Sequence, residues 1–129
     1  MTNTNSGVSN PYVFYAQNGG SYEPDNGNIG GWGGTGGNEY VTWPVYTESA
    51  GTYTLTVRYS NANGSASTRT LYVNGQDVAS LSFPTTASWD AWSTLQVSVS
   101  LNAGSNNIVL DVPSSSASNW LNVSQINVQ

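Results

Sequence analysis

The chain has 129 residues, which is the usual length of a single domain and enough to bury a hydrophobic core. Only 7% of the residues are charged, and two arginines against seven acids give a net charge of −5. Binding to phosphate backbones and anionic lipid surfaces needs clustered lysine and arginine, so this composition argues against nucleic acid and membranes as partners.

The residue types on which most enzymes depend are scarce. Cysteine and histidine are absent, which excludes disulfide bonds, thiolate or histidine metal sites and histidine-based triads. The seven acids lie mostly beside predicted turns, where a solvated carboxylate is the usual interpretation. They are Glu23, Asp25, Glu39, Glu48, Asp77, Asp90 and Asp111. A pair of carboxylates could in principle hydrolyse a glycoside, but we expect that the chain is not an enzyme.

The N-terminal segment shows no pattern of a targeting signal. Residues 1–11 lack the basic start and the apolar stretch of a signal peptide, and no apolar run approaches the ~18 residues of a membrane span. We expect residues 1–10 to be disordered or frayed and residues 11–129 to form one domain. A composition rich in hydroxyl, amide and glycine groups is frequent in secreted bacterial modules. We therefore expect a secreted, extracellular protein of which this chain is a mature fragment.

A glycine-rich segment is the first informative feature along the chain. Between residues 28 and 45, a loop with six glycines surrounds one large aromatic residue, Trp32, and a strand-like run follows. Glycine supplies no side chain to pack around an indole, so we expect Trp32 to lie open to solvent or to a ligand. The flat, uncharged, slightly polar partner that best suits such an indole is a sugar ring.

The rest of the chain alternates apolar and polar residues with a period of two, which is typical of half-buried antiparallel strands. The alternation is clearest in residues 53–59, 95–101 and 108–112. Asn74 and Gly75 lie between two such runs, and this dipeptide predicts a two-residue hairpin.

The last predicted strand shifts its alternation, since Leu121 and Val123 are odd-numbered whereas Ile126 and Val128 are even-numbered. A β-bulge near residues 124–125 accounts for the shift. No window shows the period of an amphipathic helix, so no helix longer than about one turn is expected. The pattern as a whole predicts an all-β fold, a two-sheet antiparallel β-sandwich.

The other aromatic residues divide between strands and loops. Core packing is the default role of those in or near strands, Tyr40, Trp43, Tyr53 and Tyr59. The tryptophans in loops or at loop edges are Trp89, Trp92 and Trp120. We expect one of Trp89 and Trp92 to cap the core and the other to face outward. Two or three tryptophans at one end of a sandwich would be hard to explain without a ligand.

Five segments, in order, resemble those of carbohydrate-binding modules of families 6 and 35, over about residues 13–129. They are Gly51-Thr-Tyr-Thr-Leu-Thr-Val-Arg-Tyr59, Thr70-Leu-Tyr-Val-Asn-Gly75, Trp89-Asp-Ala-Trp-Ser-Thr-Leu95, Leu101-Asn-Ala-Gly-Ser-Asn-Asn-Ile108 and Asn122-Val-Ser-Gln-Ile-Asn-Val128. Each motif is weak alone, but the five together are specific, and the middle of the chain is closer to family 35. The resemblance implies a jelly-roll-like, galactose-binding-like β-sandwich that binds polysaccharides without catalysis.

The resemblance also implies a ligand site among loops at one end of the sandwich. Its two aromatics would be Trp32 in the glycine-rich loop and Trp89, which leaves Trp92 as the core tryptophan. Its asparagine, which hydrogen-bonds sugar hydroxyls, would be Asn122 at the start of the last strand. The flanking residues that would extend the site are Asn119 and Trp120. Indoles stack on the C–H faces of sugar rings, and an amide both donates to and accepts from hydroxyls.

The family usually holds a structural calcium ion, and this chain departs from that pattern. The expected ligands are glutamates in the first strand and an aspartate in the last. Here the first strand reads Phe14-Tyr-Ala-Gln17, and Ser124 replaces the aspartate. Calcium needs several oxygen ligands with net negative charge, so we expect this site to be lost and no cofactor to be required. Calcium at another place, for example near Glu23 and Asp25, stays open.

The leading hypothesis is therefore a carbohydrate-binding module that is covalently attached to a glycoside-active enzyme and holds it on its substrate. We expect a monomer that binds a neutral polysaccharide or oligosaccharide, because scarce cations and the degraded calcium site argue against uronate. The alternative is a structural or adhesive β-sandwich repeat of a cell-surface protein, in which the tryptophans are only packed.

Overall fold

The structure is a computed structural model that describes residues 8–9, 15–17, 21–23, 28–30, 32–33, 39–113 and 119–129. These residues form strands β1 (Val8–Ser9), β2 (Tyr15–Gln17), β3 (Ser21–Glu23), β4 (Asn28–Gly30), β5 (Tyr40–Thr47), β6 (Gly51–Ser60), β7 (Ser67–Val73), β8 (Gln76–Phe83), β9 (Ser93–Leu101), β10 (Gly104–Asp111) and β11 (Asn122–Val128). Within those ranges, no helix is long and apolar enough to cross a membrane.

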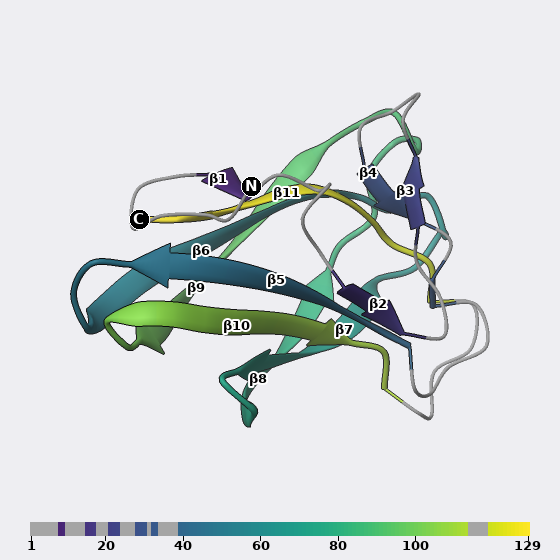
Figure 1. Cartoon of the computed structure of the whole chain (residues 1–129). Coiled ribbons are helices and arrows are strands. Elements are labelled where there is room, and N and C mark those ends of the chain that lie inside the picture. The colour runs from purple at the N-terminus through teal and green to yellow at the C-terminus, as the bar shows by residue number, and fades with distance from the viewer. Residues whose placement is uncertain are drawn as a thin grey trace.

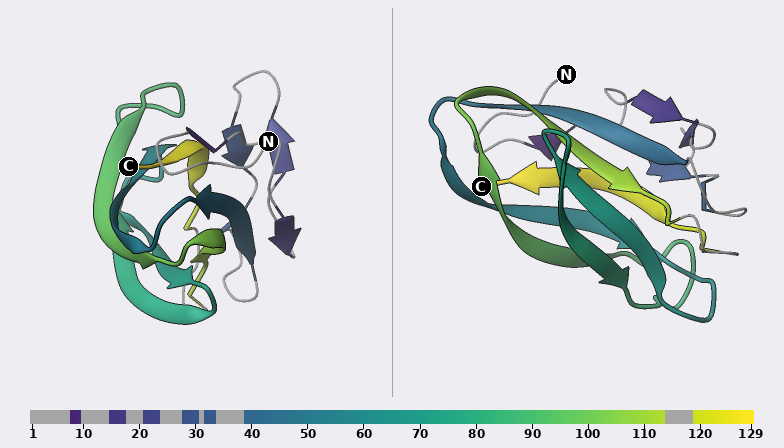
Figure 2. Two further views of the ribbon diagram at one scale, coloured as in Figure 1. Left: turned by 60° about the vertical axis from the view of Figure 1, so that its left-hand side comes forward. Right: turned by 90° about the horizontal axis from the view of Figure 1, so that it is seen from below.

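The strands form two sheets that lie as two layers (Figure 1, Figure 2). One is a five-stranded sheet with the order β2-β5-β10-β7-β8. The other is a six-stranded sheet with the order β3-β4-β11-β6-β9, in which β1 also pairs with β11. Every pairing between the described strands is antiparallel. The predicted all-β, two-sheet antiparallel sandwich is confirmed.

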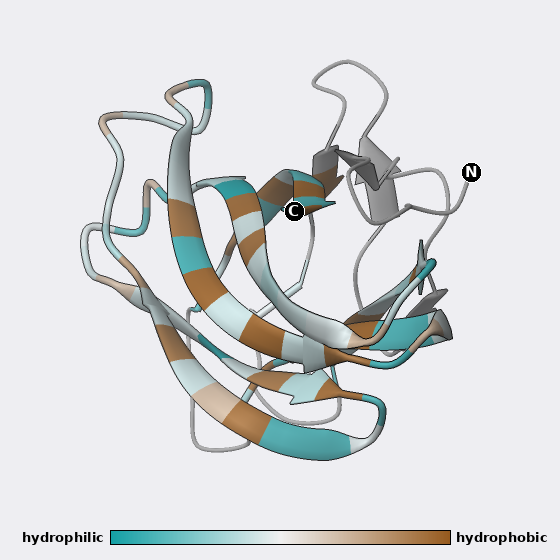
Figure 3. Ribbon diagram, turned by 90° about the vertical axis from the view of Figure 1, so that its left-hand side faces the viewer, coloured by the Kyte–Doolittle hydropathy of each residue, from teal (hydrophilic) through white to brown (hydrophobic). Residues whose placement is uncertain are grey.

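The core lies between the sheets and follows the predicted alternation, which is visible as alternating colours along the strands (Figure 3). On β6, Leu55, Val57 and Tyr59 are buried, while the residues between them are partly exposed. On β10, Ile108 and Leu110 are fully buried in the same way. One face of each strand therefore packs into the core, as the period of two predicts.

Two local predictions about the backbone are confirmed. Asn74 and Gly75 both have positive φ, 51° and 84°, which is the conformation of a tight type I′ hairpin between β7 and β8. The pairing of β11 with β6 shifts between Val123 and Gln125, at the predicted bulge. The bulge lets Val123 and Ile126 both face the core.

Two residues of the N-terminal segment form a short strand, which its polar composition did not predict. Val8 and Ser9 pair with Asn127 and Ile126 of β11, so part of the segment that we expected to be frayed belongs to the six-stranded sheet. Backbone hydrogen bonds to a strand edge do not require apolar side chains, which is why composition gave no sign of this strand. The expectation for residues 1–7 and 10 concerns positions outside the described residues.

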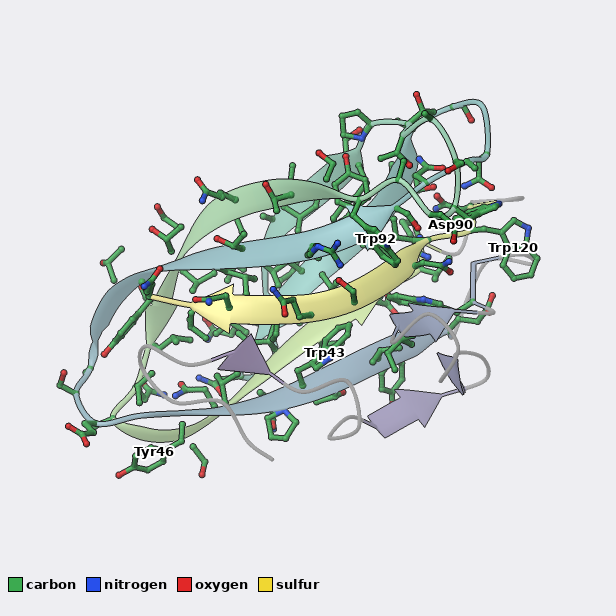
Figure 4. All side chains as sticks on the ribbon, turned by 90° about the horizontal axis from the view of Figure 1, so that it is seen from above. Trp43, Tyr46, Asp90, Trp92 and Trp120 are labelled. Carbon is green, nitrogen blue, oxygen red and sulfur yellow. The ribbon has the colours of Figure 1, made fainter. Side chains whose placement is uncertain are left out.

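The longer connections start and finish at the same end of the sandwich, because successive strands run antiparallel. Their described residues are 32–33, 39, 61–66, 84–92, 112–113 and 119–121, and we call this end the loop end. Figure 4 shows Trp92, Asp90 and Trp120 at this end, Tyr46 at the opposite end and Trp43 in the body of the sandwich. The tight turns between β5 and β6, β7 and β8, and β9 and β10 lie at the opposite end.

Trp43 has no exposed surface, as we expected for a core tryptophan. Trp43→Ala should lower the free energy of unfolding by about 3–5 kcal/mol, because it leaves a large cavity between the sheets. Denaturant unfolding measures this loss. Trp92→Ala is the matched control and should cost less, since Trp92 is only half-buried. An equal or larger loss for Trp92→Ala would contradict the assignment of the core.

Candidate functional site

A network centred on a buried asparagine joins two loops of the loop end. The side-chain amide of Asn61 donates to the carbonyls of Ser65 (3.0 Å) and Phe83 (2.9 Å), and its backbone NH donates to Thr86 Oγ1 (3.0 Å). The backbone NH of Thr86 donates in return to the Asn61 carbonyl at 2.7 Å. The loop after β6 and the loop that carries Trp89 are therefore fixed to each other.

The same loop after β6 also fixes the segment that precedes β11. The carbonyl of Trp120 accepts hydrogen bonds from Asn63 Nδ2 and Ser67 Oγ, each at 2.6 Å. Trp120 is 41% exposed, although its carbonyl is held by these two hydrogen bonds. This arrangement gives an exposed aromatic side chain on a fixed backbone, which is the property that a stacking platform needs.

Trp32 does not lie open to solvent, and the expectation that it would is wrong. Its exposed fraction is 0%. The guanidinium of Arg69 lies over its ring, with Cζ 4.1 Å from the ring centroid, and Arg69 Nη2 donates to the Trp32 carbonyl at 3.3 Å. The Arg69 side chain from β7 therefore packs over the indole, which the local sequence could not show. A fully buried indole offers no face to a ligand.

Arg69 is the centre of a buried polar cluster. Its Nη1 donates to the carbonyls of Asn119 (2.9 Å) and Thr68 (2.7 Å). Burial lowers the pKa of Arg69 to about 9, and the negative charges of Glu39 and Asp111 oppose that effect. Glu39 is itself buried and accepts a hydrogen bond from the backbone NH of Gly33 at 3.1 Å. We call Arg69, Trp32, Glu39, Gly33 and Asn119 the arginine cluster.

Asn119, which we expected to extend the ligand site, has a structural role. Its side-chain oxygen accepts from the Thr68 NH at 2.8 Å, and its Nδ2 donates to Thr68 O and Thr68 Oγ1, each at 3.0 Å. Its backbone NH donates to the Gly33 carbonyl at 2.6 Å. Only 6% of Asn119 is exposed, so its amide is engaged inside the protein.

The other sequence-predicted residues lie at the loop end with some surface open. Trp89 and Asn122 are both half-buried. Asn122 pairs with Ser60 of β6, which places it on the outer face of the six-stranded sheet, because the adjacent Tyr59 and Val123 face the core. Trp92 is also half-buried, so the expectation that it is the core tryptophan is wrong.

Arg58 explains the position of Trp92. Its guanidinium lies over the Trp92 ring, with Cζ 4.8 Å from the centroid. Arg58 Nη1 also donates to Ser124 Oγ at 2.9 Å. Trp92 therefore packs against a charged side chain on the outer face of the sheet rather than against the core.

The residues present do not fit the calcium site that the family resemblance implies. Ser124 supplies a hydroxyl in place of a carboxylate, and that hydroxyl is bonded to the positive guanidinium of Arg58. Among the residues that the structure describes, no three acidic side chains lie close enough together to hold a metal ion. The alternative near Glu23 and Asp25 depends on side chains outside the described part of the chain.

Neither arginine was singled out from the sequence. A signal for Arg69 was available: it stands at an odd position between Ser67, Leu71 and Val73, so the alternation of β7 points it into the core. A cation at a core position usually needs partners, but here those partners come from residues distant in sequence. No comparable signal pointed to Asn61 or Asn63, because loop asparagines are common.

Gly33 provides a test of how tightly the arginine cluster is packed. Its φ is +101°, and a Cβ at this position would lie 2.1 Å from the Asn119 carbonyl oxygen and 2.8 Å from Arg69 Nη2. Gly33→Ala should therefore lower the free energy of unfolding by about 1–3 kcal/mol more than an alanine at another glycine of positive φ, where the substitution adds backbone strain but no close contact. Gly64→Ala is the matched control, since Gly64 has φ +86° and an added Cβ there would meet no atom within 4 Å. Equal losses in denaturant unfolding would contradict the close approach.

Comparison with known proteins finds a matching family model and solved structures of the same fold. The model of the family described as carbohydrate binding module (family 35) matches residues 9–129. A family 35 module from Clostridium thermocellum has the same fold, with a TM-score of 0.81, 28% identity and coverage of 94% of this chain and 96% of that one.

Three larger enzymes contain a similar segment. They are the isomaltosyltransferase (47% identical over 68 residues) and 1,6-alpha-glucosyltransferase (39% over 66) of Sporosarcina globispora and the exo-beta-D-glucosaminidase of Amycolatopsis orientalis (44% over 69). Each match covers 51–53% of this chain but only 5–7% of the enzyme. The family match, which spans nearly the whole chain, shows that this protein belongs to carbohydrate-binding module family 35.

Proposed function

We propose that the chain binds a neutral glucan at the loop end, without catalysis, and keeps an attached glycoside-active enzyme on its substrate. The contacts in this proposal are the indoles of Trp120 and Trp89 and the amide of Asn122. The observation that carries it is Trp120, a 41% exposed indole whose backbone is fixed by two hydrogen bonds. Exposed aromatic surface on a fixed backbone is suited to stacking on a sugar ring.

The loops that carry these side chains form one connected unit. Asn63 holds Trp120, and Asn61, two residues earlier, holds Thr86 in the loop of Trp89. The indoles are therefore presented by backbone that needs little ordering when a ligand binds, which reduces the entropic cost of binding. In this proposal Trp32 and Asn119 support the site from below and do not contact the ligand.

The acids at the loop end support a binding role rather than hydrolysis. Glu39 is buried within the arginine cluster, whereas Asp90 is exposed on the loop between β8 and β9. Glycoside hydrolysis needs two carboxylates that flank one bond in a shared open site. A buried and an exposed acid on different segments do not meet that requirement.

We infer the class of ligand from the net charge of the chain and from the names of the related enzymes. The net charge of −5 disfavours polyanionic glycans. Two of the three related enzymes are named for transfer of isomaltosyl or 1,6-α-glucosyl units. We therefore take an α-1,6-linked glucan, with dextran as the probe, as the first ligand to test.

A single shallow site of this kind gives modest affinity, about 4–8 kcal/mol or millimolar to micromolar dissociation constants. Its effect is to raise the local concentration of substrate around an attached catalytic domain. Such a protein acts on polymers outside the cell, so the proposal includes secretion, and one site at one end of the sandwich is compatible with a monomer.

Trp120→Ala and Trp89→Ala should each weaken binding to dextran by about 1–3 kcal/mol, because each removes a stacking surface. Asn122→Ala should act in the same direction, since it leaves sugar hydroxyls without a partner. Affinity gel electrophoresis in dextran, and isothermal titration with isomaltotetraose, measure these losses.

Tyr46→Ala is the control for these variants, because Tyr46 is a 45% exposed aromatic residue at the opposite end. It should lower dextran binding by less than the loop-end variants. Parallel gels with xylan and chitosan test the sugar class. Normal dextran binding by Trp120→Ala would show that the site is misplaced, and stronger retention by xylan or chitosan would refute the α-glucan assignment.

We also propose that the fold does not depend on calcium, because Ser124 is bonded to Arg58 and offers no carboxylate. A stabilising ion would raise the melting temperature by mass action, so the melting temperature should be the same in EDTA and in excess calcium. Differential scanning calorimetry checks this. A drop of many degrees in EDTA would reveal a stabilising metal site in this chain.

A further inference from the structure

The tip of the loop between β8 and β9 is a tight turn that carries an acidic side chain directly after a tryptophan. The backbone NH of Ala91 donates to the Ser88 carbonyl at 3.1 Å, which closes a four-residue turn. Trp89 and Asp90 are its two central residues, so their Cα atoms are about 3.8 Å apart. A half-buried indole and an exposed carboxylate therefore come from the same turn, which we call the acidic turn.

The acidic turn is held in place by hydrogen bonds within its own loop and to the loop after β6. Ser88 Oγ accepts from the Asp90 NH at 3.2 Å, and the Thr86 hydroxyl donates to the Ser88 carbonyl at 2.9 Å. Thr86 is itself bonded to Asn61, through its NH and through Oγ1. The turn is therefore attached to the loop that also fixes the carbonyl of Trp120.

The Asp90 carboxylate is not used by the protein itself. Among the residues that the structure describes, no group donates a hydrogen bond to it and no ion pair includes it. Of the two cations, Arg69 is buried, and the guanidinium of Arg58 contacts Trp92 and Ser124. Both oxygens of Asp90 are therefore available to accept hydrogen bonds from a ligand, and the negative charge is uncompensated.

A carboxylate at this position has a clear chemical preference among sugars. Figure 4 shows Asp90 at the same end as Trp92 and Trp120. A carboxylate accepts through two oxygens, and such charge-assisted hydrogen bonds are stronger than those between neutral groups. Two adjacent hydroxyls of a sugar supply two donors. In an α-1,6-linked glucan the linkage uses C1 and C6, so the hydroxyls on C2, C3 and C4 of every unit are free to donate.

We propose that Asp90 is the specificity-determining residue of the loop-end site. Its carboxylate accepts hydrogen bonds from two adjacent hydroxyls of a sugar unit that stacks on Trp89, and it repels sugars that carry a carboxylate. This inference rests on the proposed glucan binding, and it assigns to one side chain the preference for a neutral ligand that we inferred there from net charge.

A local carboxylate and the net charge of the chain predict different effects of a single substitution. The charge of Asp90 acts on a ligand within a Debye length, about 8–10 Å, so its removal changes the preference only at this site. If net charge alone set the preference, the removal of any one exposed acid would have the same effect. Two acids at opposite ends of the sandwich therefore distinguish the two explanations.

The test is isothermal titration of the whole chain with dextran and with carboxymethyl-dextran of the same length. Wild type should bind dextran more tightly, and this preference should shrink in 1 M NaCl because salt screens the repulsion, with a Debye length of about 3 Å. Asp90→Asn keeps the side-chain shape without the charge, so it should reduce the preference about fivefold and make it independent of salt. Asp90→Ala also removes the acceptors and should weaken dextran binding about threefold to tenfold.

Asp77→Asn is the matched control, because Asp77 is an exposed acid of β8 at the opposite end and its loss changes the net charge by the same amount. It should keep the wild-type preference. Asp90→Glu retains the charge but moves the carboxylate by one methylene, so it should weaken dextran binding and still disfavour carboxymethyl-dextran. All four variants should melt at the wild-type temperature, since the Asp90 carboxylate bonds to no described group.

The outcomes separate this inference from the proposed function. If Asp90→Asn and Asp90→Ala both keep wild-type affinity and preference, Asp90 is only a solvated turn residue, and the inference is refuted while glucan binding at the loop end stands. An equal change of preference in Asp77→Asn would assign it to net charge and would also refute the inference. A melting temperature several degrees lower in Asp90→Asn would give Asp90 a structural role instead. If wild type binds neither polymer, the proposed α-glucan binding itself fails, and the inference fails with it.

Discussion

The loop end depends on one buried cation. The guanidinium of Arg69 joins three segments: it lies over the Trp32 ring, donates to the Asn119 carbonyl and compensates the charge of Glu39. Burying a charge costs free energy unless it is paired and hydrogen-bonded, so the cation is tolerated only while these segments are in place. The same requirement forces the segments to stay in place. Gly33 completes the arrangement, because only a residue without Cβ lets the backbone approach Asn119 this closely.

The residues that hold the loop end together therefore differ from those that we propose contact the ligand. The arginine cluster holds the glycine-rich segment and Asn119, and Asn119 is followed directly by Trp120, whose carbonyl is fixed by Asn63 and Ser67. The carbonyl of Trp120 is thus fixed by two hydrogen bonds, while the residue stays 41% exposed. Preorganisation of this kind raises the affinity of a site that has few, weak contacts, because little of the binding free energy is then spent on ordering the protein.

Features that depend on residues close together along the chain could be predicted from the sequence. The alternation of β6 and β10, the Asn74–Gly75 hairpin and the bulge after Val123 all arise from local periodicity and backbone preference, and all are present. The environment of Trp32 could not be predicted in this way. The residue that buries it, Arg69, lies 37 positions away and reaches it only through the fold. Trp92 was misassigned for the same reason, because Arg58 comes to it from a neighbouring strand.

Both cations of the chain are engaged with tryptophan rings, and this has a consequence for ligand choice. Arg69 lies 4.1 Å from the centroid of Trp32 and Arg58 lies 4.8 Å from that of Trp92, so each cation is a packing partner for an indole. The remaining charged groups are all acids. Of the two cations, only Arg58 has exposed surface, and its guanidinium already contacts Trp92 and Ser124. Stacking on aromatic rings and hydrogen bonding to amides and carboxylates remain available to a neutral ligand. The proposed preference for neutral glycans therefore rests on where the fold places its two arginines, as much as on the exposed Trp120.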